Sequence, residues 1–130
     1  MRLVLDVNAA VEVCLRRGGH ARFSRLVGEA ERVIAPDIYV SESANTAWKY
    51  YRAKALSREA AAELAENCLE FVDELISANA LWKEALAESM RLGHPVYDLL
   101  YLISARRNDA VLASADERLL GLAHKLGIQT

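Results

Sequence analysis

Residues 96–116, VYDLLYLISARRNDAVLASAD, combine a helix pattern and a strand pattern with only a short connection between them. Val96–Arg107 has a strongly apolar face at helical spacing, and Ala110–Ser114 is a continuous apolar run that is typical of a buried strand. A helix that leads directly into a buried strand is the repeating unit of a parallel sheet. Two carboxylates, Asp98 and Asp116, stand near the start of this helix and just after this strand.

The same alternation of helix and strand runs through the rest of the chain. Short apolar runs predict strands, and helices are predicted between capping residues such as Asn8 and Ser57 and stop signals such as Gly93. Asp73–Ile76 fits either the end of a helix or a short edge strand. The pattern predicts a parallel sheet covered by helices on both faces. Strands are predicted at Leu3–Leu5, Arg32–Ala35 and Ala110–Ser114, and helices at Ala9–Leu15, Ala21–Ala30, Asp37–Lys54, Leu81–Leu92, Val96–Arg107 and Asp116–Leu126, with one more helix after Ser57.

The size and composition favour one ordered domain over residues 1–130. Of its 130 residues, 53% are hydrophobic and 26% charged, which suffices for one core but not for a second domain. No apolar run could cross a membrane, and the run before Asp6 is too short for a signal peptide, so we expect a cytoplasmic protein. The net charge of -2 excludes nucleic-acid binding through a broad basic surface alone. Cys14 and Cys68 have no CxxC spacing, which favours buried reduced thiols over a disulfide.

Four carboxylates are candidates for a shared acidic pocket. Asp6 ends the first strand and Asp116 follows the last strand, so both belong at the carboxyl edge of the sheet, where parallel sheets bind ligands. Asp98 begins the helix that leads into the last strand, and Glu42 shares a helix face with Asn45. Like charges so close together repel, and a divalent cation relieves that repulsion. Oxygen-only ligands favour Mg²⁺ or Mn²⁺, which suits phosphodiester cleavage.

Each acid also has a purely structural explanation. Asp98 and Asp116 are possible helix N-caps, and Ser114 with Glu117 has the spacing of a capping box. Glu42 could simply be a solvated side chain on a helix. From the residues alone, both interpretations stay open.

Other residues with functional chemistry have simpler explanations. Trp48 and Tyr51 lie three apart on one helix beside positive charges, and we expect them to pack inward or to form a partner interface rather than to stack on RNA. His20, His94 and His124 are isolated in the sequence, so we expect surface or loop histidines and no zinc site.

These segments together resemble the PIN-domain nucleases, and within them the VapC-type toxin ribonucleases of toxin–antitoxin pairs. Asn8 and Ser114 stand where the family more often has Thr or Ser and Thr, and each keeps a polar group. The resemblance is carried by Leu3–Ala9, which looks like the family's opening strand and acid, by Pro36–Asn45, which looks like its second motif with Glu42 as the glutamate, and by Val96–Ala105 with Ala110–Asp116, which are similar to its Tyr-Asp-x-x-Tyr helix and terminal Thr-x-Asp.

The resemblance implies a three-layer α/β/α fold with a central parallel sheet of four to five short strands. It implies an endoribonuclease dependent on Mg²⁺ or Mn²⁺, with Asp6 and Asp98 as direct metal ligands and Glu42 and Asp116 completing the catalytic pocket. Polar support is expected from Asn8, Asn45 and Ser114. The expected partners are an RNA substrate, a small antitoxin protein and a second copy in a homodimer. The alternative is a PIN-fold module that binds RNA or a protein without cutting, which predicts weak or absent metal binding.

Two other acidic-pocket families fit the sequence less well. A haloacid-dehalogenase phosphatase needs a second Asp two residues after the first, where this chain has Asn8. A receiver domain needs paired acids after its first strand, an aspartate after its third strand and a lysine, and this pattern is absent.

Overall fold

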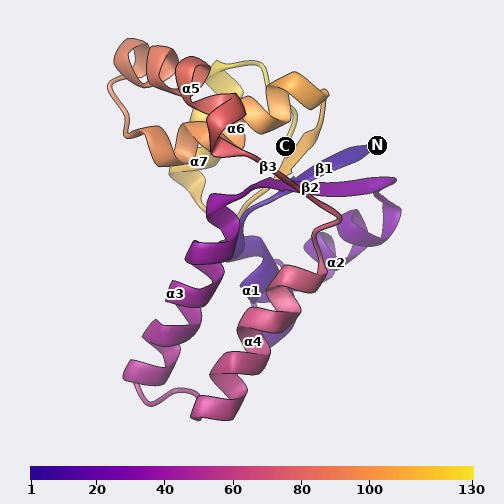
Figure 1. The fold of residues 1–130 in the computed structure, drawn as a ribbon. Helices are drawn as coiled ribbons and strands as arrows, with labels where there is room; N and C mark the ends of the chain where they lie inside the picture. The colour runs from indigo at the N-terminus through magenta and orange to yellow at the C-terminus, as the bar shows by residue number, and fades with distance from the viewer.

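The structure, a computed structural model, describes all of residues 1–130 and confirms the predicted α/β fold class (Figure 1). No helix is both long enough and apolar enough to cross a membrane. The strands are β1 (Arg2–Leu5), β2 (Arg32–Pro36), β3 (Glu74–Ile76) and β4 (Val111–Ala113), and the helices are α1 (Val7–Leu15), α2 (His20–Glu29), α3 (Ile38–Arg52), α4 (Arg58–Glu70), α5 (Ala78–Leu92), α6 (Val96–Asn108) and α7 (Glu117–Lys125).

The four strands form one parallel sheet in the order β3-β2-β1-β4. The ambiguous stretch 73–76 supplies β3, which lies at one edge of this sheet. Helices α5, α6 and α7 lie on one side of the sheet and the N-terminal helices on the other, which confirms the three-layer arrangement (Figure 1). Because the chain reaches β2 on one side of β1 and β4 on the other, the carboxyl ends of β1 and β4 form a switch point, the usual ligand site of such sheets.

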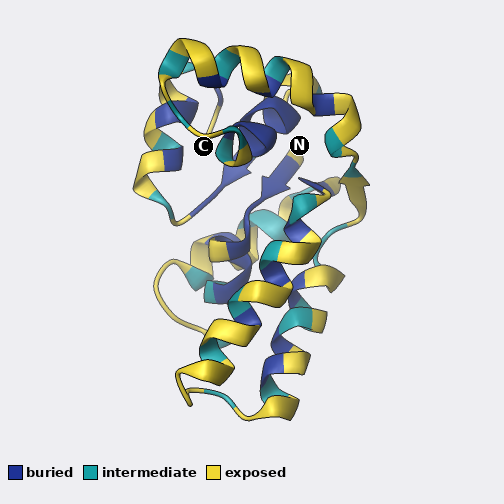
Figure 2. Cartoon of the chain, turned by 60° about the vertical axis from the view of Figure 1, so that its left-hand side comes forward, coloured by how far each residue is buried: buried dark blue, intermediate teal, exposed yellow.

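The hydrophobic core centres on β1 and α6. Leu3, Val4 and Leu5 of β1 are fully buried, as expected for a central strand of a parallel sheet. In α6, seven consecutive residues, Leu99–Ala105, are buried (Figure 2). The sequence predicts only one strongly apolar face for this helix, whereas the structure buries it on all sides, between the sheet and α5. A helix enclosed in this way holds whatever side chains it carries in fixed positions.

Helices α3 and α4 pack side by side and project away from the sheet as an arm, the α3–α4 arm (Figure 1). The Ser57 hydroxyl accepts a hydrogen bond from the Ala60 N–H at 3.1 Å, which confirms Ser57 as the cap of α4. Helix α1 packs against both α3 and α4 and connects the base of the arm to the end of β1.

Candidate active site

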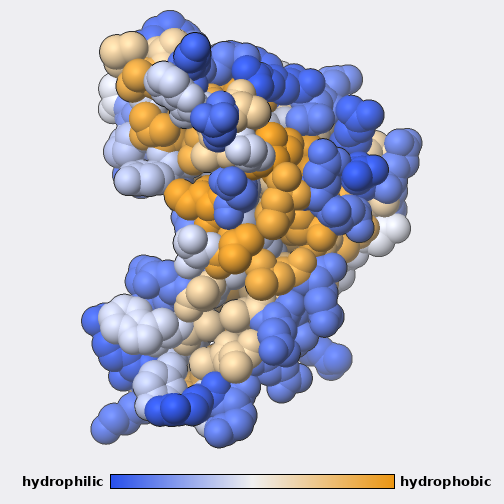
Figure 3. Space-filling model, viewed as in Figure 1, coloured by the Kyte–Doolittle hydropathy of each residue, from blue (hydrophilic) through white to orange (hydrophobic).

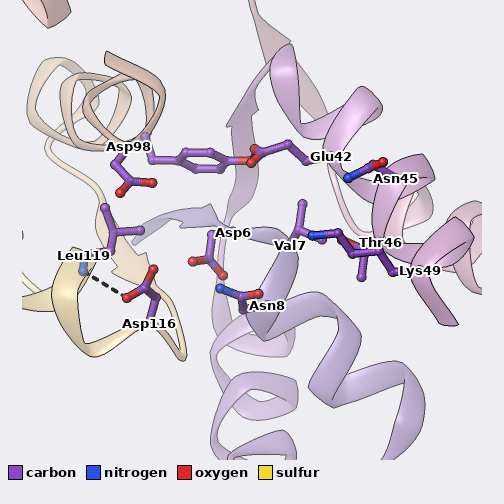
Figure 4. A pocket seen from close by; sticks show the side chains of 11 residues that line it. Asp6, Val7, Asn8, Glu42, Asn45, Thr46, Lys49, Asp98, Asp116 and Leu119 are labelled. Carbon is purple, nitrogen blue, oxygen red and sulfur yellow. Dashed lines mark hydrogen bonds between the residues drawn. The ribbon is translucent and has the colours of Figure 1, made fainter. Parts of the chain in front are cut away.

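All four carboxylates singled out from the sequence line one pocket of about 220 Å³ (Figure 4). They come from four places in the chain: Asp6 follows β1, Glu42 lies on α3, Asp98 on α6, and Asp116 directly precedes α7. The pocket thus sits at the β1/β4 switch point. Its remaining lining residues are Val7, Asn8, Asn45, Thr46, Lys49, Tyr101 and Leu119.

Asp6 is the most enclosed of the four acids, with 5% of its surface exposed. Its Oδ1 accepts a hydrogen bond from the Ala9 N–H at 3.0 Å, so Asp6 caps α1 and the expectation that Asn8 is the cap is wrong. Burial raises the pKa of Asp6 from 3.8 to about 6, because the cost of removing the carboxylate from water exceeds the gain from its hydrogen bonds. A cation in the pocket would offset that cost.

Ser114 links the acids that follow β1 and β4. Its hydroxyl donates to Oδ2 of Asp6 and accepts a hydrogen bond from the Asp116 N–H at 3.0 Å. Asp116 in turn caps α7, because its Oδ1 accepts from the Arg118 and Leu119 N–H groups at 2.9 and 3.3 Å. The capping explanation of Asp116 is therefore correct, but the same residue also lines the pocket. The cap is Asp116 itself, so Ser114 and Glu117 do not form the predicted capping box.

Asp98 lies in the first turn of α6 and does not cap it, since Pro95 holds the cap position. Nε2 of His94 donates to Oδ2 of Asp98 at 2.7 Å, and Nη2 of Arg118 lies 3.9 Å from the same oxygen. The expectation that His94 is an isolated surface or loop residue is wrong, because its side chain is only 10% exposed. The available sequence signal was its position four residues before an acid.

Glu42 is bound by a residue that the sequence analysis did not assign to the site. The Tyr101 hydroxyl on α6 donates to Oε1 of Glu42 at 2.6 Å. Burial raises the pKa of Glu42, partly opposed by this hydrogen bond, and burial also raises the pKa of Tyr101, which keeps the phenol protonated as a donor. Tyr101 lies three residues after Asp98 and therefore faces the same way, which was a readable signal.

Lys49 is the second residue that sequence reasoning missed. It is exposed, it lines the acidic pocket, and it extends the row of pocket residues on α3 by one turn beyond Asn45 and two beyond Glu42. The predicted supporting residues Asn8 and Asn45 line the pocket as well.

The donor set fits a small, hard divalent cation. All four acids offer oxygen, which Mg²⁺ and Mn²⁺ prefer. No three of the chain's potential ligands converge on a ready-made metal cage. Mg²⁺ usually keeps several waters and takes only one or two carboxylates directly, so it does not need such a cage.

A parallel sheet in this order with acids at its switch point defines the class of protein, and the chain belongs to the PIN domain family, whose model matches residues 3–125. It is similar to Ribonuclease VapC3 of Pyrobaculum aerophilum, with 28% identity over 121 residues covering 92% of each chain. The resemblance to VapC-type PIN nucleases is therefore confirmed.

Two solved structures share the fold. The crystal structure of PAE2754 from Pyrobaculum aerophilum has a TM-score of 0.74 and 19% identity, covering 93% of this chain and 84% of that one. VapBC2 from Rickettsia felis, solved bound to a DNA fragment from their promoter, has a TM-score of 0.63 and 15% identity, covering 89% and 88%. At these identities the likeness concerns the fold alone.

Proposed function

We propose that the chain is a metal-dependent endoribonuclease that hydrolyses RNA phosphodiester bonds, and that it is the toxin of a toxin–antitoxin pair. One observation carries the proposal: four carboxylates from separate elements line a single pocket at the switch point of a PIN fold. The name of the similar P. aerophilum ribonuclease supports RNA as the substrate.

Asp6 and Asp98 are the proposed ligands of Mg²⁺ or Mn²⁺. When bound, such an ion lowers the pKa of a water and stabilises charge on the phosphoryl oxygens. Ser114 and the Ala9 N–H orient Asp6, while His94 orients Asp98.

The other pocket residues have separate proposed roles. Tyr101 occupies Oε1 of Glu42, so Oε2 is the atom that accepts a proton from the attacking water. Lys49 contributes positive charge to the RNA backbone at the pocket rim, where acids would otherwise repel it. Asn8 and Asn45 hydrogen-bond the RNA, and Asp116 completes the acidic pocket.

The deciding experiment compares Asp6→Asn with the wild-type chain on end-labelled RNA in Mg²⁺ or Mn²⁺. We expect cleavage to fall by at least about 100-fold and Mn²⁺ binding to weaken, with an unchanged circular dichroism spectrum. Asp109→Asn is the matched control, because it makes the same chemical change at an exposed position outside the pocket. Undiminished cleavage by Asp6→Asn would contradict the assignment. A wild-type chain that binds RNA but neither binds Mn²⁺ nor cuts would favour the non-catalytic PIN module.

The antitoxin is proposed to bind the α3–α4 arm. Trp48 and Tyr51 are 49% and 42% exposed, so the expectation that they pack inward is wrong and a partner interface is the remaining explanation. They flank an apolar groove of about 350 Å³, and Figure 3 shows its apolar strip between the two helices. An amphipathic helix is the occupant that such a groove accepts. The groove is lined by Ala44, Ala47, Trp48, Tyr51, Arg58, Ala61, Ala62 and Ala65.

The homodimer is proposed to form through the outer face of α5. Trp82, Leu86 and Met90 recur every four residues there and are 45%, 40% and 72% exposed. A two-fold axis at Leu86 pairs Trp82 of one copy with Met90 of the other, a favourable aromatic–sulfur contact. Light scattering should show a dimer that Leu86→Arg converts to monomer. A wild-type monomer would contradict this part of the proposal.

A further inference from the structure

The only two cysteines of the chain lie side by side. Cys14 is in the last turn of α1 and Cys68 in the last turns of α4, and 54 residues separate them in the sequence. Their Sγ atoms are 4.0 Å apart, and both are free thiols. The two sulfurs are thus in contact across a helix–helix interface, and a bond between them needs an approach of about 2 Å.

The two thiols differ in access. Cys68 is 1% exposed, whereas Cys14 is half-buried and lines a surface cleft of about 170 Å³ with Leu56 and Asn67. The hydrogen bond between them lowers the pKa of Cys14 and raises the pKa of Cys68. A small oxidant therefore reaches Cys14 first, where thiolate character favours attack, and Cys68 stands behind it as the only neighbouring thiol.

We propose that Cys14 and Cys68 form a redox-active dithiol that a peroxide oxidises to an intramolecular disulfide. The Cys14 thiolate attacks one peroxide oxygen, the O–O bond breaks, and the leaving oxygen takes up a proton, which leaves a sulfenic acid on Cys14. The Cys68 sulfur then attacks Sγ of Cys14, the S–O bond breaks, and water leaves with the Cys68 proton. The two thiols lose two electrons and the peroxide is reduced to two waters. A dithiol reductant reverses the reaction.

The new bond would join α1 to α4. Helix α1 begins immediately after Asp6, and α4 packs on α3, which carries Glu42. The bond therefore links two elements that both adjoin the pocket, and it closes a long loop in the unfolded chain. Loop closure on this scale raises the melting temperature of a domain of this size by about 10 °C. This inference does not depend on the proposed function.

The test uses the purified full-length chain treated with a small excess of hydrogen peroxide. We expect both thiols to disappear, the intact mass to fall by two hydrogen atoms, and non-reducing peptide mapping to join the Cys14 and Cys68 peptides. The melting temperature should rise by about 10 °C and return with dithiothreitol. The proposal is overturned if both thiols persist, if the mass rises by whole oxygen atoms, or if only disulfides between chains form.

Two serine variants separate the roles of the thiols. Cys68→Ser should show no rise in melting temperature and should accumulate a sulfenic acid on Cys14 that a sulfenic-specific reagent traps. Cys14→Ser should leave Cys68 unreacted over the same time, because Cys68 is buried. Equal reactivity of Cys68 in that variant would contradict the proposed order of attack. The wild-type peptide map decides the main claim even if a variant folds poorly.

Discussion

Helix α3 has two faces with opposite physical character. One face contributes Glu42, Asn45, Thr46 and Lys49 to the acidic pocket, and the other contributes Ala44, Ala47, Trp48 and Tyr51 to the apolar groove of the α3–α4 arm. On the pocket face, Glu42 is bound by a tyrosine of the buried helix α6. On the groove face, large aromatic side chains stand exposed.

The difference lies in where each face carries an energetic cost. The pocket face gathers like charges that are partly removed from water, which a cation relieves. The groove face leaves apolar area in water, which another protein surface relieves. One helix therefore places a candidate chemical site and a candidate docking site back to back, and substitutions on its two faces should have separable effects.

Glu42→Gln should give the largest effect and divide the two faces most clearly. We expect RNA cleavage to fall by about 100- to 1000-fold, because the amide can no longer accept a proton at this position. Binding of the small protein encoded by the neighbouring reading frame should be unchanged, since Glu42 is not in the groove. Cleavage assays and calorimetry measure both, with the exposed Glu59→Gln on α4 as control. Equal losses of cleavage and binding would break the comparison.

Asp6→Asn should stabilise the metal-free protein. Since the pKa of Asp6 is about 6 in the folded state, against an ordinary value of 3.8, the folded chain favours the protonated form. This contribution to stability is complete below about pH 4 and is lost as pH rises through 6. At pH 7 the variant should gain about 3 kcal/mol, or about 10 °C in melting temperature.

Thermal melts in a chelator from pH 4 to pH 8 measure this difference. The gap between Asp6→Asn and wild type should widen with pH, and saturating Mn²⁺ should narrow it by stabilising the wild type. A gap that does not change with pH would show that the buried carboxylate carries no such cost.

Trp48→Ala tests the groove face. Removing an exposed aromatic anchor from the groove should weaken binding of the neighbouring-frame protein by about 30-fold, with RNA cleavage within a factor of two of wild type. Trp82→Ala, an exposed tryptophan on α5, is the matched control for partner binding. Loss of cleavage without loss of partner binding would instead place Trp48 on the RNA path.

His94→Ala should have the smallest effect and refine the account of the pocket. Loss of its hydrogen bond to Asp98 should weaken Mn²⁺ binding by about 10-fold, as for other partners of metal ligands. His94→Gln keeps an N–H donor and should recover most of that affinity. If both variants bind Mn²⁺ like the wild type, His94 does not position Asp98.

The sequence was sufficient for most of the fold because its elements are clearly delimited. Ser57 and Gly93 mark helix ends where the structure has them. The register of β3 could not be read, since Glu74–Ile76 is short and largely exposed, which leaves no apolar pattern to distinguish strand from helix.

The candidate site was predictable only in part. The acids could be placed because strand ends fix their edge of the sheet, as for Asp6. The groups that hold them could not, because His94 contacts Asp98 across the start of α6 and Ser114 reaches Asp6 across 108 residues. Sequence spacing likewise gave no sign that Cys14 and Cys68 meet, since that contact depends on how α1 and α4 pack.

The complete enclosure of α6 limits how this pocket can be regulated. Asp98 and Tyr101 stand on the element with the longest run of buried residues, so their displacement would require the opening of the whole domain rather than a local fluctuation. Amide hydrogens in the middle of α6 should exchange with deuterium only through global unfolding. A physiological inhibitor therefore has to act by covering or filling the pocket, and one that works by distorting its acids would have to overcome the stability of the entire fold.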